Sequence, residues 1–145
     1  MIAADLAALG GMFLAAFLAA TPIPMQSELA FLGLAAAGWP LTALVVVASV
    51  GNTLGSGLTY AAGRGLGNAG LWRWFRLPPD KLARAEAWFL RWGAWSLLLS
   101  WAPGGDVLVA LSGALRMPLW RFLPVVALAK TARYTALAWV TSAAL

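Results

Sequence analysis

Several ionisable side chains stand where the surrounding sequence is otherwise apolar. Glu28 and Asp106 each follow a short segment rich in proline or glycine, whereas Lys130 and Arg133 lie within one long apolar segment. A charge at the centre of a bilayer costs at least a few kcal/mol unless it is paired or hydrated. These two acids and two bases are therefore expected either to form structural ion pairs or to line a site that handles protons or anions.

Three further polar residues are candidates for the same site. Asn52 is the midpoint of the apolar residues 41–62, where a buried amide needs a hydrogen-bond partner. The glycines around it indicate close helix packing rather than a phosphate loop, because no strand precedes them. Arg64 has two interpretations, a positively charged anchor or a contact to a lipid phosphate, and Arg116 is a further basic candidate.

The composition excludes most soluble and catalytic classes. Hydrophobic residues make up 62% of the 145 residues and charged residues only 10%, against roughly 25% charged in soluble domains. The absence of His and Cys excludes imidazole or thiolate metal sites and Ser–His or Cys nucleophiles. We therefore expect a membrane protein that is not an enzyme, has no cofactor or metal and binds no nucleic acid.

The apolar segments differ in whether they are interrupted. Residues 41–62 and 119–145 are long enough to cross about 30 Å of hydrocarbon. Residues 6–20 and 29–37 are separated by a proline-rich break, and residues 94–102 and 107–115 by a Pro-Gly-Gly break. Nine helical residues reach only about halfway across a bilayer. Each interrupted segment is therefore predicted to be a re-entrant hairpin.

The chain is predicted to be one membrane domain with three parts. Residues 1–62 hold the first hairpin and spanning helix, and residues 94–145 hold the second pair. Between them, residues 63–93 form a basic loop that the positive-inside rule places in the cytoplasm. Within this loop Leu82, Ala85 and Phe89 recur at helical spacing, which predicts an amphipathic helix at the membrane interface.

The two halves also repeat. A shift of 78 positions places Glu28 on Asp106, Pro40 on Pro118 and Asn52 on Lys130. If each hairpin returns to its starting side, the first unit enters from outside and the second from the cytoplasm. The predicted fold class is thus an all-α integral membrane protein in which two re-entrant hairpins and two transmembrane helices form an inverted repeat, an architecture of many secondary transporters.

The motifs of this sequence resemble those of the DedA superfamily, also called the SNARE-associated or VTT-domain family, and most closely its YqaA-like branch. The resemblance covers nearly the whole chain. It is carried by residues 20–28 (ATPIPMQSE), 51–55 (GNTLG), 63–64 (GR), 97–106 (LLLSWAPGGD) and 130–134 (KTARY), with Gly113 and Arg116.

The resemblance implies an inner-membrane protein with two opposed re-entrant hairpins that takes part in lipid translocation. Members resemble flippases or scramblases, including recyclers of undecaprenyl phosphate, and the proton-motive force is implicated. The family's first-hairpin acid corresponds to Glu28. Two arginines that flank the second-hairpin proline in the main bacterial branch are Ser100 and Asp106 here. The candidate basic groups therefore become Arg116, Lys130 and Arg133.

Two functions follow as hypotheses. In the first, the chain is a transporter or lipid translocase in the bacterial inner membrane, and anionic lipid headgroups or protons engage Glu28, Asp106, Lys130 and Arg133. Two spanning helices make a thin wall around such a path, so a homo-oligomer is expected. In the second, the chain organises a membrane complex, and its intramembrane charges only fasten helices together.

Overall fold

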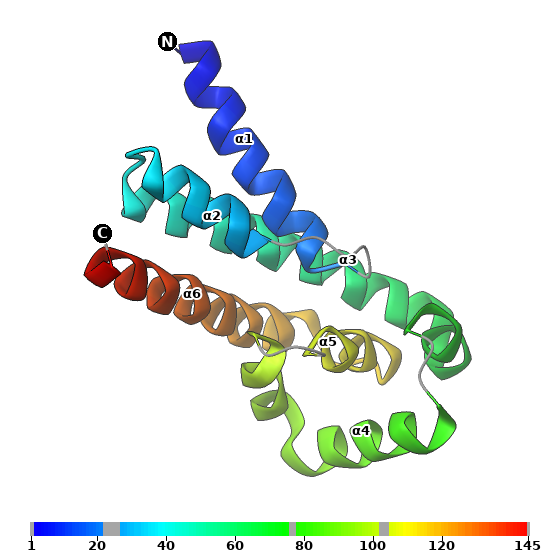
Figure 1. The fold of residues 1–145 in the computed structure, drawn as a ribbon. Coiled ribbons are helices and arrows are strands. Elements are labelled where there is room, and N and C mark those ends of the chain that lie inside the picture. The colour runs from blue at the N-terminus through cyan, green and yellow to red at the C-terminus, as the bar shows by residue number, and fades with distance from the viewer. Residues whose placement is uncertain (1, 22–26, 76–77, 102–104, 145) are drawn as a thin grey trace.

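The computed structural model describes residues 2–21, 27–75, 78–101 and 105–144, and every regular element within them is helical, as the sequence predicts. The elements are α1 (Ile2–Ala19), α2 (Ser27–Ala36), α3 (Leu41–Phe75), α4 (Pro79–Trp92), the 3-10 helix η1 (Gly93–Trp101), α5 (Gly105–Ala114) and α6 (Leu119–Ala144). Figure 1 shows the two long helices, α3 and α6, side by side, with α1 and α2 towards one end and α4, η1 and α5 towards the other.

In the long helix α3, the exposed face is apolar and the buried face is polar. Its exposed face carries apolar side chains at every fourth position, and each is about half exposed. They are Val46, Val50, Leu54 and Leu58. The buried face carries Ser49, Asn52, Ser56 and Thr59, each at most 6% exposed. A helix in water has the opposite pattern, so this distribution fits a helix whose outer face contacts lipid.

The apolar interior divides into two clusters, one at each end of the helix pair. The first joins Met12, Phe31 and Leu44 to Tyr134 of α6. The second is built on Phe122, α5 and α4, and Tyr60 of α3 lies in it. Because the start of α3 meets the end of α6 and the later part of α3 meets the start of α6, the two long helices are antiparallel.

The turns that lead into the two long helices have the same construction. Ser27 and Gly105 begin α2 and α5, Leu41 and Leu119 begin α3 and α6, and both pairs are 78 positions apart. In a Schellman ending of α2, the amide of Trp39 donates to Leu34 O over 3.1 Å.

The ending of α5 repeats this hydrogen bond. The amide of Met117 donates to Ser112 O over 2.9 Å. The residue that reverses the chain has a positive φ in both turns, 95° at Gly38 and 59° at Arg116. The two turns, and the helices that begin on either side of them, therefore correspond in structure as well as in sequence.

Glycines bring several helices into backbone contact. Side chains at Gly51 and Gly55 would collide with the carbonyls of Phe13 and Phe17 in α1. The predicted close packing around Asn52 is thus confirmed. Gly63 of α3 and Gly113 of α5 make a second contact of this kind. A Cβ at Gly63 would collide with the backbone of α5, and a Cβ at Gly113 would collide with the backbone of α3.

The predicted boundary at residue 62 was wrong. The helix predicted for 41–62 continues to Phe75, so the segment 63–93 begins as helix rather than as loop. Its basic charge between two apolar halves suggested a loop, but Gly63 is the position where α5 packs against α3. The predicted amphipathic helix is confirmed as α4, whose Leu82 and Phe89 are buried. The hairpin arm predicted for residues 94–102 corresponds to a 3-10 helix, η1, over Gly93–Trp101.

By length and apolar composition, two of the described helices can cross a membrane: α1 and the part Leu41–Gly65 of α3. The first arm is therefore longer than the 15 residues predicted. Helix α6 has the length of a span, but Arg121, Lys130 and Arg133 lower its mean hydropathy. The predicted breaks at Pro22 to Pro24 and at Pro103-Gly104 lie outside the described residues.

Candidate functional site

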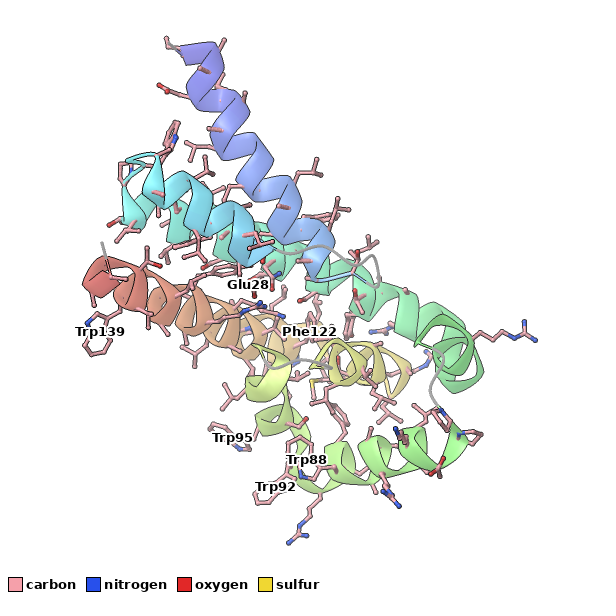
Figure 2. The ribbon with its side chains drawn as sticks, in the orientation of Figure 1. Glu28, Trp88, Trp92, Trp95, Phe122 and Trp139 are labelled. Carbon is pink, nitrogen blue, oxygen red and sulfur yellow. The ribbon has the colours of Figure 1, made fainter. Side chains whose placement is uncertain are left out.

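The start of α2 is joined to α6 by an ion pair and a hydrogen bond from consecutive residues. The Arg133 guanidinium pairs with the Glu28 carboxylate, and these side chains are 24% and 33% exposed. Next to the pair, the hydroxyls of Ser27 and Tyr134 are 2.8 Å apart, and both residues are fully buried. Figure 2 shows Glu28 at the beginning of α2, between that helix and α6. The predicted pairing of Glu28 with a basic residue of the last helix is thus present, with Arg133 as the partner.

Tyr134 supports this contact from the apolar side. Its ring stacks on Phe31 of α2 with a centroid separation of 6.0 Å. The Arg133 guanidinium carbon lies 5.5 Å from the centroid of the same ring, within the range of a cation–π contact. Arg133 therefore contacts a carboxylate and an aromatic face together, and both contacts limit the rotamers that it can adopt.

Lys130 lies one helical turn before Tyr134 in α6 and is only 1% exposed. It has interactions within the protein. Lysine is almost never fully buried in proteins unless it is paired. The predicted intramembrane lysine is therefore enclosed by the bundle, and it lies on the helix that carries the Glu28 partner.

Asn52 occupies the equivalent position of α3 and is also 1% exposed. Its Nδ2 donates to Ala16 O of α1 over 2.7 Å. Its buried Oδ1 atom accepts no hydrogen bond from the described residues. The sequence predicted that this amide would need a partner, and the described part of the chain provides one for the donor but none for the acceptor.

The structure places Arg64 and Arg116 at the other end of the bundle. Arg64 is 12 residues after Asn52 in α3, which is about 18 Å along a helix. Its guanidinium donates to the Tyr60 hydroxyl over 3.0 Å, and that hydroxyl donates to Met117 O. Arg116 is exposed and adjacent to Met117. Arg64 therefore belongs to a second polar cluster, centred on Tyr60, and Arg116 is next in sequence to a residue of that cluster.

Asp106 is the second residue of α5, the position that Glu28 has in α2. Its side chain lies outside the described part of the chain. Among the residues that the structure describes, no group of three His, Cys, Asp or Glu side chains gathers where it could hold a metal ion.

Several polar residues of these clusters were not among the predicted site residues. Ser27 and Tyr134 had no signal beyond their proximity in sequence to Glu28 and Arg133. Ser49 and Ser56 had a signal, because their spacings of three and four from Asn52 place all three on one helix face. Tyr60 is four residues before Arg64, a spacing that predicts side-chain contact.

A separate cleft of about 610 Å³ opens between η1 and the start of α6. It is lined by Trp95, Trp120, Arg121, Pro124 and Val125. Trp95 and Trp120 are 73% and 70% exposed, and the Arg121 guanidinium carbon lies 4.9 Å from the Trp120 ring centroid. Exposed tryptophan beside arginine is typical of a membrane–water interface.

Comparisons with known proteins agree over most of the chain. A family model described as the VTT domain matches residues 6–143. The inner membrane protein YqaA of Escherichia coli is 36% identical over 139 residues, which cover 90% of this chain and 88% of that protein. An uncharacterized protein of Haemophilus influenzae is 35% identical over 144 residues, which cover 90% of this chain and 85% of that protein. No solved structure matches the chain.

Proposed function

The chain belongs to the VTT-domain family, in its DedA and YqaA-like group, and from this premise we propose that it is an inner-membrane transporter or lipid translocase. Its substrates are anionic lipids, including the polyprenyl-phosphate class, and protons act as the coupling ion. Glu28, Asp106, Lys130, Arg133 and Asn52 form the path, with Arg64 and Arg116 as phosphate contacts at its end. No enzymatic step is part of the proposal.

The observation that carries the proposal is a buried lysine in the middle of α6, with a buried amide at the equivalent depth of α3. Lys130 is 11 residues from the start of α6, as Asn52 is from the start of α3. This is about 16 Å along a helix, roughly half of the hydrocarbon thickness. Charges at such depth normally mark substrate or ion pathways. A cation on α6 lies beside an acid on α2. In such a site an anionic headgroup can take the place of the carboxylate as the partner of the cation.

The backbone repeat supports an inverted topology. The two repeat units end in antiparallel long helices, and in each a short helix precedes the turn into the long one. Two antiparallel units around a central site are a common arrangement in secondary transporters. We infer that α1 with α2, and η1 with α5, enter from opposite sides as re-entrant hairpins.

The distribution of charge supports the orientation of this topology. Residues 63–93 contain six basic and two acidic residues, so the positive-inside rule places them in the cytoplasm. Figure 2 shows Trp88 and Trp92 of α4 and Trp95 of η1 at this end of the molecule, and α4 itself carries basic residues of this segment. Trp88 is 37% exposed and Trp92 48% exposed. These tryptophans and basic residues would lie at the cytoplasmic surface of the inner membrane. Homo-oligomers would complete the wall around the substrate path.

A second function, organisation of a membrane complex, is favoured by one observation. Glu28 and Ser27 both bind α6, which is the arrangement that a purely structural fastening of α2 requires. In that case the exposed residues of 63–93 form the partner surface, and the charges have no substrate.

Reconstitution into liposomes that contain labelled anionic lipids, with and without a pH gradient, separates the two functions. We expect the wild-type protein to accelerate lipid movement and Glu28→Gln to abolish it while accumulation in the membrane stays near normal. Asp80→Asn is the matched control, because Asp80 is an exposed acid of α4. Wild-type liposomes no faster than protein-free ones, or an active Glu28→Gln variant, would contradict translocation.

A further inference from the structure

The cleft between η1 and the start of α6 has the size and the walls of a ligand pocket, and the proposed function does not use it. Its volume is about 610 Å³, and pockets for small molecules usually measure about 300–1,000 Å³ and are mostly apolar. Trp95 of η1 and Trp120 of α6 both line the cleft. They are 73% and 70% exposed, so the cleft is open to a ligand from the surrounding membrane.

The depth of the cleft in the bilayer follows from its place on α6. Arg121 is nine residues before Lys130, which is about 14 Å along a helix. Half of the hydrocarbon thickness is about 15 Å, so a helix with Lys130 near the bilayer centre has Arg121 close to the lipid headgroups. Pro124 and Val125 are nearer to Lys130 and therefore lie at the depth of the acyl chains. The cleft thus offers a cation at headgroup depth and an apolar wall at chain depth.

The charge of the cleft favours a phosphate. Arg121 is exposed, and its guanidinium carbon lies 4.9 Å from the centroid of the Trp120 ring. Among the described residues no carboxylate pairs with Arg121, so its N–H donors are available to a ligand. A guanidinium binds two oxygens of one phosphate with parallel hydrogen bonds, and it is more weakly hydrated than an ammonium group. An anionic ligand is therefore expected beside the two tryptophans.

A lipid suits this cleft better than a second protein chain does. A protein partner would have to bury Arg121 against a carboxylate of its own, and removing both charges from water is costly. An anionic phospholipid carries its phosphate and its acyl chains in one molecule, at the two depths where the cleft has its cation and its apolar wall.

We propose that the cleft binds one anionic phospholipid from the leaflet on the side of α4. The phosphate pairs with the Arg121 guanidinium, and one acyl chain lies between Trp95 and Trp120, against Pro124 and Val125. This lipid is a resident ligand that joins η1 to α6, and it is not the cargo. The site does not rest on the proposed function, because a lipid can be retained there whether or not the chain moves lipids.

Lipid retention by the purified full-length protein in neutral detergent tests the site. The probes are dioleoylphosphatidylglycerol and dioleoylphosphatidylcholine, which have the same chains but differ in net charge, and native mass spectrometry measures their binding. Arg121→Gln removes the phosphate contact, and Trp95→Ala removes one wall of the cleft. Arg84→Gln is the matched control for the charge, because Arg84 is an exposed residue of α4. Trp139→Ala is the control for the indole, because Trp139 is 78% exposed and lies near the other end of α6 (Figure 2).

We expect the wild-type protein to retain one phosphatidylglycerol and to bind it about fivefold more tightly than phosphatidylcholine, as a single ion pair near water allows. Arg121→Gln should lose this preference, and Trp95→Ala should weaken the binding of both lipids because less apolar surface is buried. Both controls should bind as the wild type does. Equal binding of the two lipids by the wild type would overturn the proposal. An equal loss in Arg84→Gln would also overturn it, because the lipid would then respond only to surface charge.

Two further measurements identify the occupant. Glycerol 3-phosphate, which has the phosphate without the chains, should not displace phosphatidylglycerol at equal concentration. Displacement would indicate a site for free anions and would overturn the lipid. A wild-type dimer that Trp95→Ala converts into a monomer would also overturn it, because a second copy would then occupy the cleft.

The liposome assay separates this site from the proposed function. Selective retention of phosphatidylglycerol without lipid movement keeps the site and rejects the proposed function. Lipid movement without selective retention rejects the site alone.

Discussion

The two short helices that precede the long ones are held in different ways. Helix α5 packs backbone to backbone on α3 through Gly113 and Gly63. Helix α2 is held to α6 by the side chains of Ser27, Glu28 and Phe31. The positions equivalent to Gly113 and Gly63 are Ala35 and Thr141, whose side chains prevent the same close approach.

The two contacts therefore differ in role. The glycine contact is structural, whereas the side-chain contact can be replaced by another ligand. Backbone packing through glycine leaves no side chain that a substrate can compete for. An ion pair and a hydroxyl pair can be replaced by a headgroup or by a proton, one partner at a time. We therefore interpret the α3–α5 contact as the fixed part of the bundle and the α2–α6 contact as its working part.

Charge reversal at the α2–α6 contact is expected to have the largest effect. Glu28→Arg puts two cations together inside the bundle, where like charges are poorly screened, so we expect at least tenfold less protein in the membrane. Adding Arg133→Glu restores the pair and should restore accumulation. If the contact is the working part, the double variant accumulates but does not move lipid. Liposome assays on the purified double variant measure this, and full activity would leave a structural fastening as its only role.

The glycine contact of the second unit gives the next largest effect. Gly113→Ala drives a Cβ into the backbone of Tyr60, and overpacking of this kind costs about 1–3 kcal/mol. We expect a clear fall in the melting temperature. Gly33→Ala is the control, because a Cβ there meets no atom within 4 Å and alanine favours helix. Equal melting temperatures for the two variants would refute the division into a fixed and a working part.

The sequence predicted the features that depend on residues close together in the chain or on the overall balance of polar and apolar residues. The all-helical fold, the amphipathic α4, the spacing of 78 positions between the starts of α2 and α5 and of α3 and α6, and the pairing of Glu28 with a basic residue of the last helix all belong to this class. The structure was needed to identify Arg133 as the partner, because that depends on how α2 and α6 align. It was also needed to show that Gly63 is a helix contact, because a glycine-rich segment is equally compatible with a loop.

The two buried tyrosines allow a finer comparison. Tyr134 bonds the Ser27 hydroxyl, whereas Tyr60 bonds Met117 O and accepts from Arg64. Position 105, equivalent to Ser27, is glycine and carries no hydroxyl. Removing one hydrogen bond costs about 1 kcal/mol, so Tyr60→Phe and Tyr134→Phe should lower stability by similar amounts. Lipid movement is expected to fall only with Tyr134→Phe, and an equal fall in both variants would show that the Tyr60 hydroxyl also takes part in the path.

The smallest expected effect concerns the residue that reverses the chain after each short helix. Gly38 adopts its positive φ without strain, but a side chain in this conformation costs Arg116 about 1 kcal/mol. Arg116→Gly should therefore raise the melting temperature by a few degrees, whereas Gly38→Ala should lower it by a similar amount. A stabilised Arg116→Gly variant with slower lipid movement would indicate that the second unit retains its arginine for the substrate at a cost in stability. Unchanged lipid movement would remove Arg116 from the path and leave the second unit purely structural at this turn.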